Sequence, residues 1–357
     1  MASVLRVGIL GASGYGGAGL MERLGRHPHA RVTAIGSRQY AGQGVDACWP
    51  HLAGLFPDLV FTNEDEVIAA SDVVFCATPH GATAPVAKKA LDAGRYVVDL
   101  SADFRLGAET YAEWYGGTHP HPELIDEAVY GLVELHRDEL VAKRLIASPG
   151  CNATAASMAL APLAAAGLLG PSAVANVITG VSGAGRSTSG PLHYPEMDEN
   201  ARAYKPSGTH RHTAEIEATV GRVLKGGKRL STHAPFEPYT VSFTPHIVPM
   251  SRGILATCAT RVPEEGLSDE AVIQVLRDYY AGDPLVRVQD DLPQTKAVYG
   301  SDRVVLSGRF DPRSGHVLVF CAIDNLGKGA AGQAVQAFNV SQGFPETAGL
   351  RLEGVWP

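Results

Sequence analysis

The chain has 357 residues, a formal net charge of −7, and a composition that is 45% hydrophobic and 19% charged. Its length exceeds that of one typical domain, and its apolar share argues against disorder along most of the chain. The charge is spread without a basic run, so nothing in it indicates nucleic-acid binding. We therefore expect a two-domain enzyme that holds any phosphate ligand through local groups.

The first apolar run, residues 4–10, is typical of a buried strand, and Gly11-Ala12-Ser13-Gly14-Tyr15-Gly16-Gly17 follows it directly. A helical pattern with Leu20 and Leu24 on one face comes next. The pyrophosphate of a dinucleotide requires this order, because glycines let the backbone approach it and the helix start offers free N–H groups. The spacing is G-x-x-G-x-x-G and not G-x-G-x-x-G, but residues 31–35 are typical of a second strand that closes the β-α-β unit. The residues that we expect to bind the cofactor here are Gly11, Ser13, Gly14, Tyr15 and Gly16.

The sequence Gly36-Ser37-Arg38 follows the second predicted strand, where an acidic residue would bind the ribose 2′-hydroxyl of NAD. A hydroxyl and a guanidinium suit a 2′-phosphate instead, so Ser37 and Arg38 favour NADP(H). The alternative for Arg38 is a solvated surface charge.

Two further apolar runs, residues 73–77 and 96–100, end in small or polar residues. Parallel strands end in this way where they line a ligand crevice. Thr78 and Ser101 are therefore candidates to line the cofactor path. The alternative is that they cap the helices that follow.

A last strand is predicted at residues 145–147, and Gly150-Cys151-Asn152 then opens an alanine-rich stretch. A cysteine at a helix start lies at the positive end of the helix dipole, which lowers the thiol pKa and favours the thiolate. The same backbone donors can stabilise an oxyanion on a bound acyl group. Cys151 is therefore the candidate nucleophile.

The remaining cysteines fit the alternative of a small buried thiol or stay unassigned. Cys76, Cys258 and Cys321 lie inside apolar runs, and Cys48 lies in a loop. The five cysteines are far apart and odd in number, without metal-ligand spacing, which favours reduced thiols. The N-terminus lacks a signal-peptide pattern, so we expect a cytoplasmic protein. The uncharged stretch at residues 153–169 has the length of a membrane span, but its small and polar residues indicate a buried helix pair.

A second segment, residues 204–215, carries two histidines and an arginine in a glycine-containing loop just before a predicted helix start. Thiolate chemistry needs a proton carrier, and this loop is the best place for one. His210 and His212 could also ligate a metal, but no third group of ligands accompanies them, so we expect no metal site.

Several motifs along nearly the whole chain are similar to those of one family. The chain resembles the N-acetyl-gamma-glutamyl-phosphate reductases of arginine biosynthesis, relatives of the aspartate-semialdehyde dehydrogenases. The resemblance rests on the glycine loop at residues 11–17 and on the runs Asp99-Leu100-Ser101-Ala102-Asp103-Phe104-Arg105, Pro149-Gly150-Cys151-Asn152, Ser182-Gly183-Ala184-Gly185-Arg186, His210-Arg211-His212-Thr213, Phe243-Thr244-Pro245-His246 and Asp324-Asn325-Leu326-Gly327-Lys328-Gly329.

The resemblance implies a fold, an oligomer and a division of roles. It implies a Rossmann-type NADP-binding domain at residues 1–150, completed by a C-terminal helical segment at 325–357. It also implies an α+β catalytic and oligomerisation domain at 151–324, with a mixed sheet and a homodimer or homotetramer. A strong hairpin signal at residues 304–323 supports strands there. Asn325 would lie near the nicotinamide.

The reaction implied is the reduction of an acyl phosphate to an aldehyde. Cys151 would attack the acyl phosphate to give a thioester, NADPH would deliver hydride, and His212 would protonate the thiohemiacetal oxygen. Ser182, Gly183 and Arg186 form a small loop suited to the phosphate, although Arg186 could be a surface charge. The other substrate-binding candidates are Asn152, His210 and Glu215.

Two alternatives stay open at this stage. The first is the related reductase of a carrier-bound 2-aminoadipyl phosphate in lysine synthesis, where residues 204–212 look similar. The run at residues 243–246 and the acidic charge of the chain favour the arginine enzyme. The second is a non-catalytic NADP-binding regulator, which would not need a cysteine at a helix start.

Overall fold

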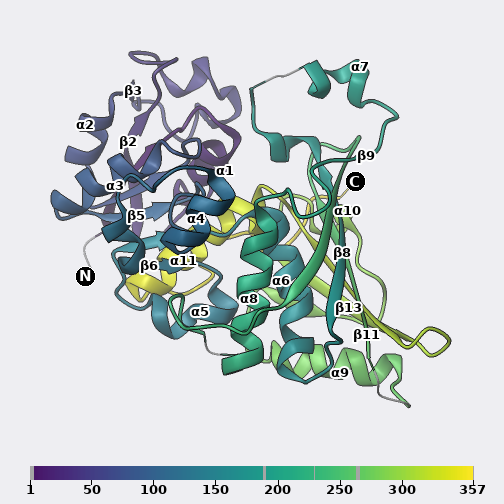
Figure 1. Ribbon diagram of the computed structural model, residues 1–357. Coiled ribbons are helices and arrows are strands. Elements are labelled where there is room, and N and C mark those ends of the chain that lie inside the picture. The colour runs from purple at the N-terminus through teal and green to yellow at the C-terminus, as the bar shows by residue number, and fades with distance from the viewer. Residues whose placement is uncertain (1–3, 188–189, 229, 263–265, 357) are drawn as a thin grey trace. The chain divides into compact units, whose positions relative to one another are not determined.

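The structure is a computed structural model that describes residues 4–187, 190–228, 230–262 and 266–356 (Figure 1). The chain forms two compact units. Unit 1 comprises Met1–Pro149 and Ala330–Leu350, and unit 2 comprises Gly150–Gly329 and Arg351–Pro357. The tail after residue 350 thus clusters with unit 2, whereas the sequence led us to assign all of residues 325–357 to the first domain.

Unit 1 is built on a seven-stranded, fully parallel sheet in the order β3-β2-β1-β4-β5-β7-β6. Its strands are β1 (Leu5–Leu10), β2 (Ala30–Gly36), β3 (Phe61–Thr62), β4 (Val73–Cys76), β5 (Tyr96–Asp99), β6 (Ala128–Tyr130) and β7 (Leu145–Ala147). Its helices are α1 (Tyr15–Leu24), α2 (Glu64–Ala69), α3 (Thr83–Asp92), α4 (Ala108–Tyr115), α5 (Val133–Leu140) and α11 (Gly332–Gln342). The strands predicted at β1, β2, β4, β5 and β7 are confirmed to within one residue at each end.

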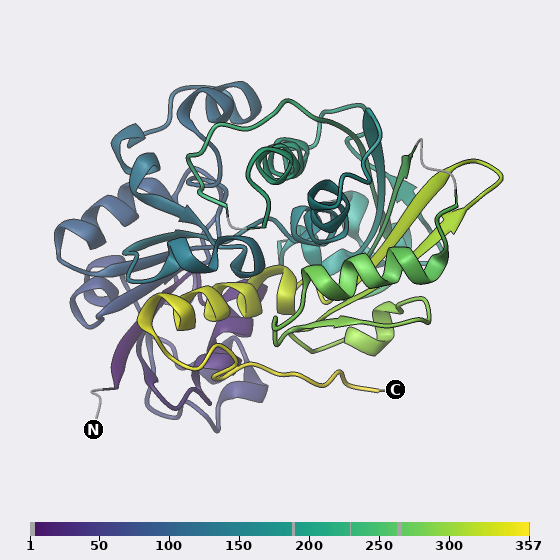
Figure 2. The same ribbon diagram turned by 90° about the horizontal axis from the view of Figure 1, so that it is seen from below.

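Two apolar layers hold this sheet, one on each face. Val7 and Ile9 of β1 pack in one cluster with α1, α5 and α11. Leu10 belongs to the opposite cluster, with α2 and α3. Helix α11, drawn in yellow in Figure 2, returns from unit 2 to pack on α1 and α5. A parallel sheet with helices on both faces is the Rossmann-type arrangement expected from the sequence.

Unit 2 is built on a seven-stranded mixed sheet in the order β12-β13-β14-β11-β8-β10-β9. Its strands are β8 (Ser172–Gly180), β9 (Arg202–Ala203), β10 (Thr240–Val248), β11 (Ile254–Arg261), β12 (Val286–Val288), β13 (Val304–Asp311) and β14 (His316–Ile323). Its helices are α6 (Cys151–Ala165), α7 (Tyr194–Met197), α8 (His212–Gly226), α9 (Asp269–Tyr279) and α10 (Thr295–Val298). The predicted hairpin is confirmed as β13 and β14, which pair antiparallel.

Helices α6, α8 and α9 pack on this mixed sheet, and α6 and α8 lie side by side (Figure 1). The strands alternate accordingly. In β8, Ala173, Ala175 and Val177 are buried, while Val174 between them is exposed. Together the two units give the α/β fold with a parallel and a mixed sheet that the sequence predicts.

The alanine-rich stretch forms one helix, α6, and the predicted helix pair is wrong. Pro162 lies inside this 15-residue helix. A proline there cannot donate to the carbonyl four residues earlier, which is that of Met158. The Tyr280 hydroxyl donates to this carbonyl at 2.6 Å, so the helix continues without an unsatisfied group. Among the described residues no helix is long and apolar enough to cross a membrane.

Candidate active site

The glycine loop of unit 1 is a cradle made of backbone. Gly11 has a φ of +73°, and a Cβ there would lie 2.3 Å from the carbonyl oxygen of Ala77. A Cβ on Gly17 would lie 2.4 Å from the Cα of Ala12. At Gly14 and Gly16 the nearest protein atoms are 3.4 and 3.6 Å from such a Cβ, so these two glycines keep room for an approaching ligand.

The helix start beside this loop suits an anion. Helix α1 begins after Gly14 with no side-chain cap and no acidic residue in its first turn. Its first N–H groups and the positive end of its dipole therefore remain for a phosphate. The cradle and the helix start fit the pyrophosphate of a dinucleotide.

The residues expected to select NADP lie next to the loop. The hydroxyls of Ser13 and Ser37 are 2.8 Å apart, which ties the end of β2 to the loop. Arg38 follows and is exposed. On the other side, the Trp49 indole donates to the carbonyl of Ala12 at 2.9 Å. This geometry suits a 2′-phosphate near Arg38.

Thr78 and Ser101 make contacts within unit 1. The hydroxyl of Thr78 is 2.6 Å from that of Thr83, the first residue of α3, but no side chain caps this helix, so the capping alternative is not confirmed. Ser101 is buried, donates to Asp99 at 2.9 Å and accepts from the backbone N–H of Asp103 at 3.1 Å. The structure thus gives Ser101 a structural role, and its place at the cofactor stays a prediction.

In unit 2, Cys151 is the first residue of α6, as predicted. Its N-cap, Gly150, offers no side-chain bond, and the first turn holds no acidic residue. Cys151 is half-buried, whereas the other four cysteines are buried. Burial raises the pKa of the Cys258 thiol to about 12 and holds that of Cys76 well above its ordinary value. Of the five thiols, Cys151 has the environment that a nucleophile needs.

His212 lies against the residue before the cysteine. It is the first residue of α8, and a Cβ on Gly150 would lie 2.3 Å from its Nε2. Only a glycine leaves room for the imidazole there. The His212 ring is thus held beside the start of the nucleophile helix.

Glu215 ties these two elements together. Its Oε2 accepts from the Gly150 N–H at 2.9 Å, and its Oε1 lies 4.0 Å from Nε2 of His212. The Glu215 side chain is buried and links the starts of α6 and α8, and its expected role in binding substrate stays a prediction.

His210 contacts both the backbone and the ring of His212. Its Nδ1 accepts from the His212 backbone N–H at 3.1 Å, and the two rings meet edge to face at 4.6 Å. Burial, with the charge of His212 second, lowers the pKa of His210 to about 3. This shift favours a neutral His210 near pH 7, and which of the two histidines carries the proton stays a prediction.

The expected phosphate loop follows β8. Ser182 is held by the side chain of Asn325, which donates to its hydroxyl at 2.9 Å and accepts from the N–H of Gly253 at 2.8 Å. Gly183 and Arg186 are exposed on the same loop. Asn325 is thus bonded once to this loop and once to Gly253 before β11, and its place near the nicotinamide stays a prediction.

Sequence reasoning missed the carboxylate that shapes this part of the site. Asp324 is fully buried and accepts from the backbone N–H groups of Gly300 at 2.6 Å, Leu326 at 2.8 Å and Gly327 at 3.0 Å. Its other partner is the guanidinium of Arg252, at 3.0 Å. The turn that Asp324 holds packs on Cys151, since a Cβ on Gly329 would lie 2.9 Å from the Cβ of Cys151. The glycines after Asp324 were the signal that could have found it.

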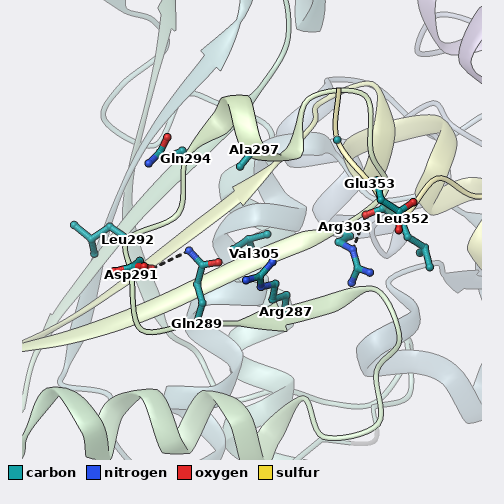
Figure 3. A pocket seen from close by; sticks show the side chains of 11 residues that line it. Arg287, Gln289, Asp291, Leu292, Gln294, Ala297, Arg303, Val305, Leu352 and Glu353 are labelled. Atoms are coloured by element: carbon teal, nitrogen blue, oxygen red, sulfur yellow. Dashed lines mark hydrogen bonds between the residues drawn. The ribbon is translucent and has the colours of Figure 1, made fainter. Parts of the chain in front are cut away.

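Other features of the described chain lie outside this centre. A cavity of about 560 Å³ adjoins β12 and β13, with Arg287, Gln289 and Arg303 among its lining (Figure 3). None of the expected site residues is among its described lining. Within residues 4–187, 190–228, 230–262 and 266–356, no group of three or more His, Cys, Asp or Glu side chains could hold a metal ion.

Comparisons with known proteins agree on the family. Residues 6–143 match the model described as semialdehyde dehydrogenase, NAD binding domain, and residues 151–325 match semialdehyde dehydrogenase, dimerisation domain. A relative from Thermus thermophilus, named N-acetyl-gamma-glutamyl-phosphate reductase, is 49% identical over 98% of this chain and 100% of its own. One of the same name from Symbiobacterium thermophilum is 44% identical over 99% of each chain.

Solved structures show the same fold at low identity. Aspartate semialdehyde dehydrogenase II from Vibrio cholerae, complexed with ASA, is 18% identical with a TM-score of 0.68, over 94% of this chain and 97% of its own. Aspartate semialdehyde dehydrogenase with NADP from Candida albicans is 20% identical with a TM-score of 0.68, over 95% of this chain and 100% of its own.

Proposed function

The chain belongs to the N-acetyl-gamma-glutamyl-phosphate reductases of the semialdehyde dehydrogenase family, and from this premise we propose that Cys151 and His212 carry its reaction. It is an NADP-dependent oxidoreductase that reduces N-acetyl-gamma-glutamyl phosphate to N-acetylglutamate 5-semialdehyde and phosphate, a step of arginine biosynthesis. The observation that carries the assignment of residues is the position of His212 over Gly150, directly before the half-buried Cys151.

The first step forms a thioester. His212 takes the proton from Sγ of Cys151, and the helix start stabilises the thiolate. Sγ then attacks the acyl carbon, a C–S bond forms, and the bond to the phosphate oxygen breaks. The departing phosphate takes the electron pair and can receive the proton from His212. Glu215 stabilises the imidazolium between these two transfers.

The second step reduces this thioester. When bound, NADPH supplies a hydride to the thioester carbon. The first N–H groups of α6, and His212 once it has taken a new proton from solvent, are suited to stabilise the oxyanion of the tetrahedral adduct. The adduct collapses, the C–S bond breaks with its electrons returning to Sγ, and the aldehyde leaves.

The remaining site residues complete the proposal. The glycine cradle of unit 1 holds the pyrophosphate, and Ser37 with Arg38 holds the 2′-phosphate, since the loop and its neighbours fit such a ligand. Thr78, Ser101 and Asn325 stay proposed at the cofactor. Ser182, Gly183 and Arg186 bind the substrate phosphate, while Asn152 and His210 act close to the acyl group.

Domains, assembly and location extend this proposal. We assign cofactor binding to residues 1–150 together with the returning segment after residue 325, and catalysis to residues 151–324. The match to a dimerisation domain supports an oligomer, and we propose a homodimer or homotetramer. None of the five cysteines, all of them among the described residues, forms a disulfide, which suits the cytosol.

A reverse assay tests this function. The protein receives NADP⁺, phosphate and either free N-acetylglutamate 5-semialdehyde or the carrier-bound 2-aminoadipate semialdehyde. We expect phosphate-dependent NADPH formation with the free acetylated aldehyde and none in Cys151→Ser. Preference for the carrier-bound aldehyde would assign the chain to lysine synthesis, and an active Cys151→Ser would exclude the thioester.

A further inference from the structure

Both chain neighbours of Cys151 hold the segment that carries the histidines. Gly150 lies under the ring of His212, so close that a Cβ on Gly150 would overlap the ring. Asn152 donates from its side-chain amide to the hydroxyl of Tyr204 at 3.2 Å. The start of the nucleophile helix therefore touches the histidine segment at its two ends.

A stack of rings connects these two points. The ring of Tyr204 meets that of His210 edge to face, at 5.5 Å between centroids. His210 meets His212 in the same way at 4.6 Å and also packs on Phe243 at 5.2 Å. The series Asn152, Tyr204, His210, His212, Gly150 thus starts and ends on either side of Cys151. Tyr204 thus contacts His212 indirectly, through the ring of His210.

The backbone between Tyr204 and His210 is strained. Lys205 and Ser207 have positive φ values of 44° and 58°, in the left-handed region that side chains other than glycine rarely adopt. Such strain persists where the surroundings fix it, and it clusters at functional sites. Tyr204 is the anchor on one side of this turn, because its N–H also donates to the carbonyl of Pro245 at 3.0 Å.

Asn152, which bonds to Tyr204, also places an unfavourable polar atom in the protein interior. Asn152 is buried, and its carbonyl oxygen has no hydrogen-bond partner among the described residues. A buried polar atom without a partner destabilises a fold, and an apolar residue of the same shape would avoid this. A pair that served the fold alone would not need an amide at this position.

Resting on the roles proposed for Cys151 and His212, we propose that Tyr204 is a positioning residue of this reaction. Held by Asn152, its side chain fixes the ring stack that presents His212 to Cys151. Burial raises the pKa of the Tyr204 hydroxyl to about 12, and the negative charge of Cys151 is the second cause, which agrees with the closeness of Tyr204 to the start of α6.

A double-mutant cycle with His212 tests this role. Tyr204→Phe keeps the ring and removes the bond to Asn152, so we expect kcat to fall roughly 10- to 100-fold, as a small misplacement of a catalytic group does. The rate of Cys151 alkylation near neutral pH should fall with it, while the Kd for NADPH stays unchanged. In the His212→Asn background, Tyr204→Phe should cause no further loss. The matched control is Tyr194→Phe, at a tyrosine that is 76% exposed, which should behave as wild type.

Asn152→Leu provides the second variant. It removes the same bond from the other partner, so its effect on the rate of Cys151 alkylation, measured without substrate, should equal that of Tyr204→Phe and should not add to it. If Tyr204→Phe does not fold, Asn152→Leu takes its place in the double-mutant cycle with His212→Asn. A wild-type kcat in Tyr204→Phe, or an equal loss with and without His212, would overturn the proposal. Since Cys151→Ser tests the thioester separately, these outcomes are distinct from a failure of the proposed function.

Discussion

The two functional regions of this protein are built from different material. In unit 1 the glycine loop binds through backbone, and what matters is the absence of side chains at Gly11, Gly14 and Gly16. In unit 2 the centre consists of side chains that hold one another, from Asn152 through Tyr204 and the histidines to Glu215. A side chain added to the glycine loop would take up the space for the ligand, whereas a side chain removed from the unit 2 centre would break contacts that hold the others.

Removing the imidazole should have the largest effect on the side-chain centre. His212→Asn loses the proton carrier but keeps a polar residue at the helix start, so kcat should fall roughly 10²- to 10⁴-fold. NADPH affinity, measured by fluorescence titration, should stay unchanged because the cradle lies in unit 1. His193→Asn serves as the control and should retain activity. A larger loss in His210→Asn than in His212→Asn would reverse the assignment.

Adding a methyl group tests whether each site depends on a glycine that leaves room for its neighbour. Gly150→Ala places a Cβ 2.3 Å from the ring of His212, a side chain that can rotate away. We expect kcat to fall roughly 10²-fold, the scale for a misplacement of about 1 Å, with little change in Tm. Gly11→Ala places its Cβ 2.3 Å from a backbone oxygen at a φ of +73°, so it should lower Tm instead.

The control for both is Gly226→Ala, at the end of α8, where a Cβ meets nothing within 4 Å. It should change neither kcat nor Tm. If Gly150→Ala keeps full activity, the contact between Gly150 and His212 does not matter for catalysis.

The same difference explains what the sequence could predict. The cradle was recognisable because its glycines lie within seven residues directly after a strand. The helix start at Cys151 was recognisable because Gly-Cys precedes a long helical run. The hydrogen bond between Glu215 and Gly150 was not recognisable, since the two residues are 65 positions apart. The carboxylate of Asp324 accepts from Gly300 and Arg252, which are distant in the sequence, and only the glycines that follow Asp324 mark it locally. Likewise, only the fold shows that Tyr280 allows α6 to continue past Pro162.

Within unit 1, Arg38 is the exception, a side chain in a site made of backbone. Arg38→Ala should raise the KM for NADPH about 10-fold, the weight of one charge-assisted bond in an exposed place, and leave that for NADH nearly unchanged. Arg31→Ala, at an exposed arginine in β2 of the same unit, is the matched control. Equal effects on both cofactors would show that Arg38 does not meet the 2′-phosphate.

The smallest effect is an opposite response of the two regions to pH. His210 has its pKa lowered to about 3 in the fold, so its contribution to stability is present above pH 6.5 and is lost as the pH falls towards 3. Burial raises the pKa of Asp99 to about 7, so stability declines as the pH rises from 3.8 to about 7. The free energy of unfolding, measured in urea, should fall less on the acid side, below pH 6.5, in His210→Asn than in wild type. In Asp99→Asn the loss of stability between pH 3.8 and about 7 should be smaller than in wild type. Parallel curves for variant and wild type would contradict the assignment.

The central claim is that Cys151 carries the acyl group. It is tested most directly by mixing the enzyme with N-acetyl-gamma-glutamyl phosphate in the absence of NADPH and measuring the intact mass after acid quench. We predict one N-acetylglutamyl group per chain, located on the peptide of Cys151, removed by hydroxylamine and absent in Cys151→Ser. Turnover on addition of NADPH without any such adduct, or an adduct on another cysteine, would contradict the account.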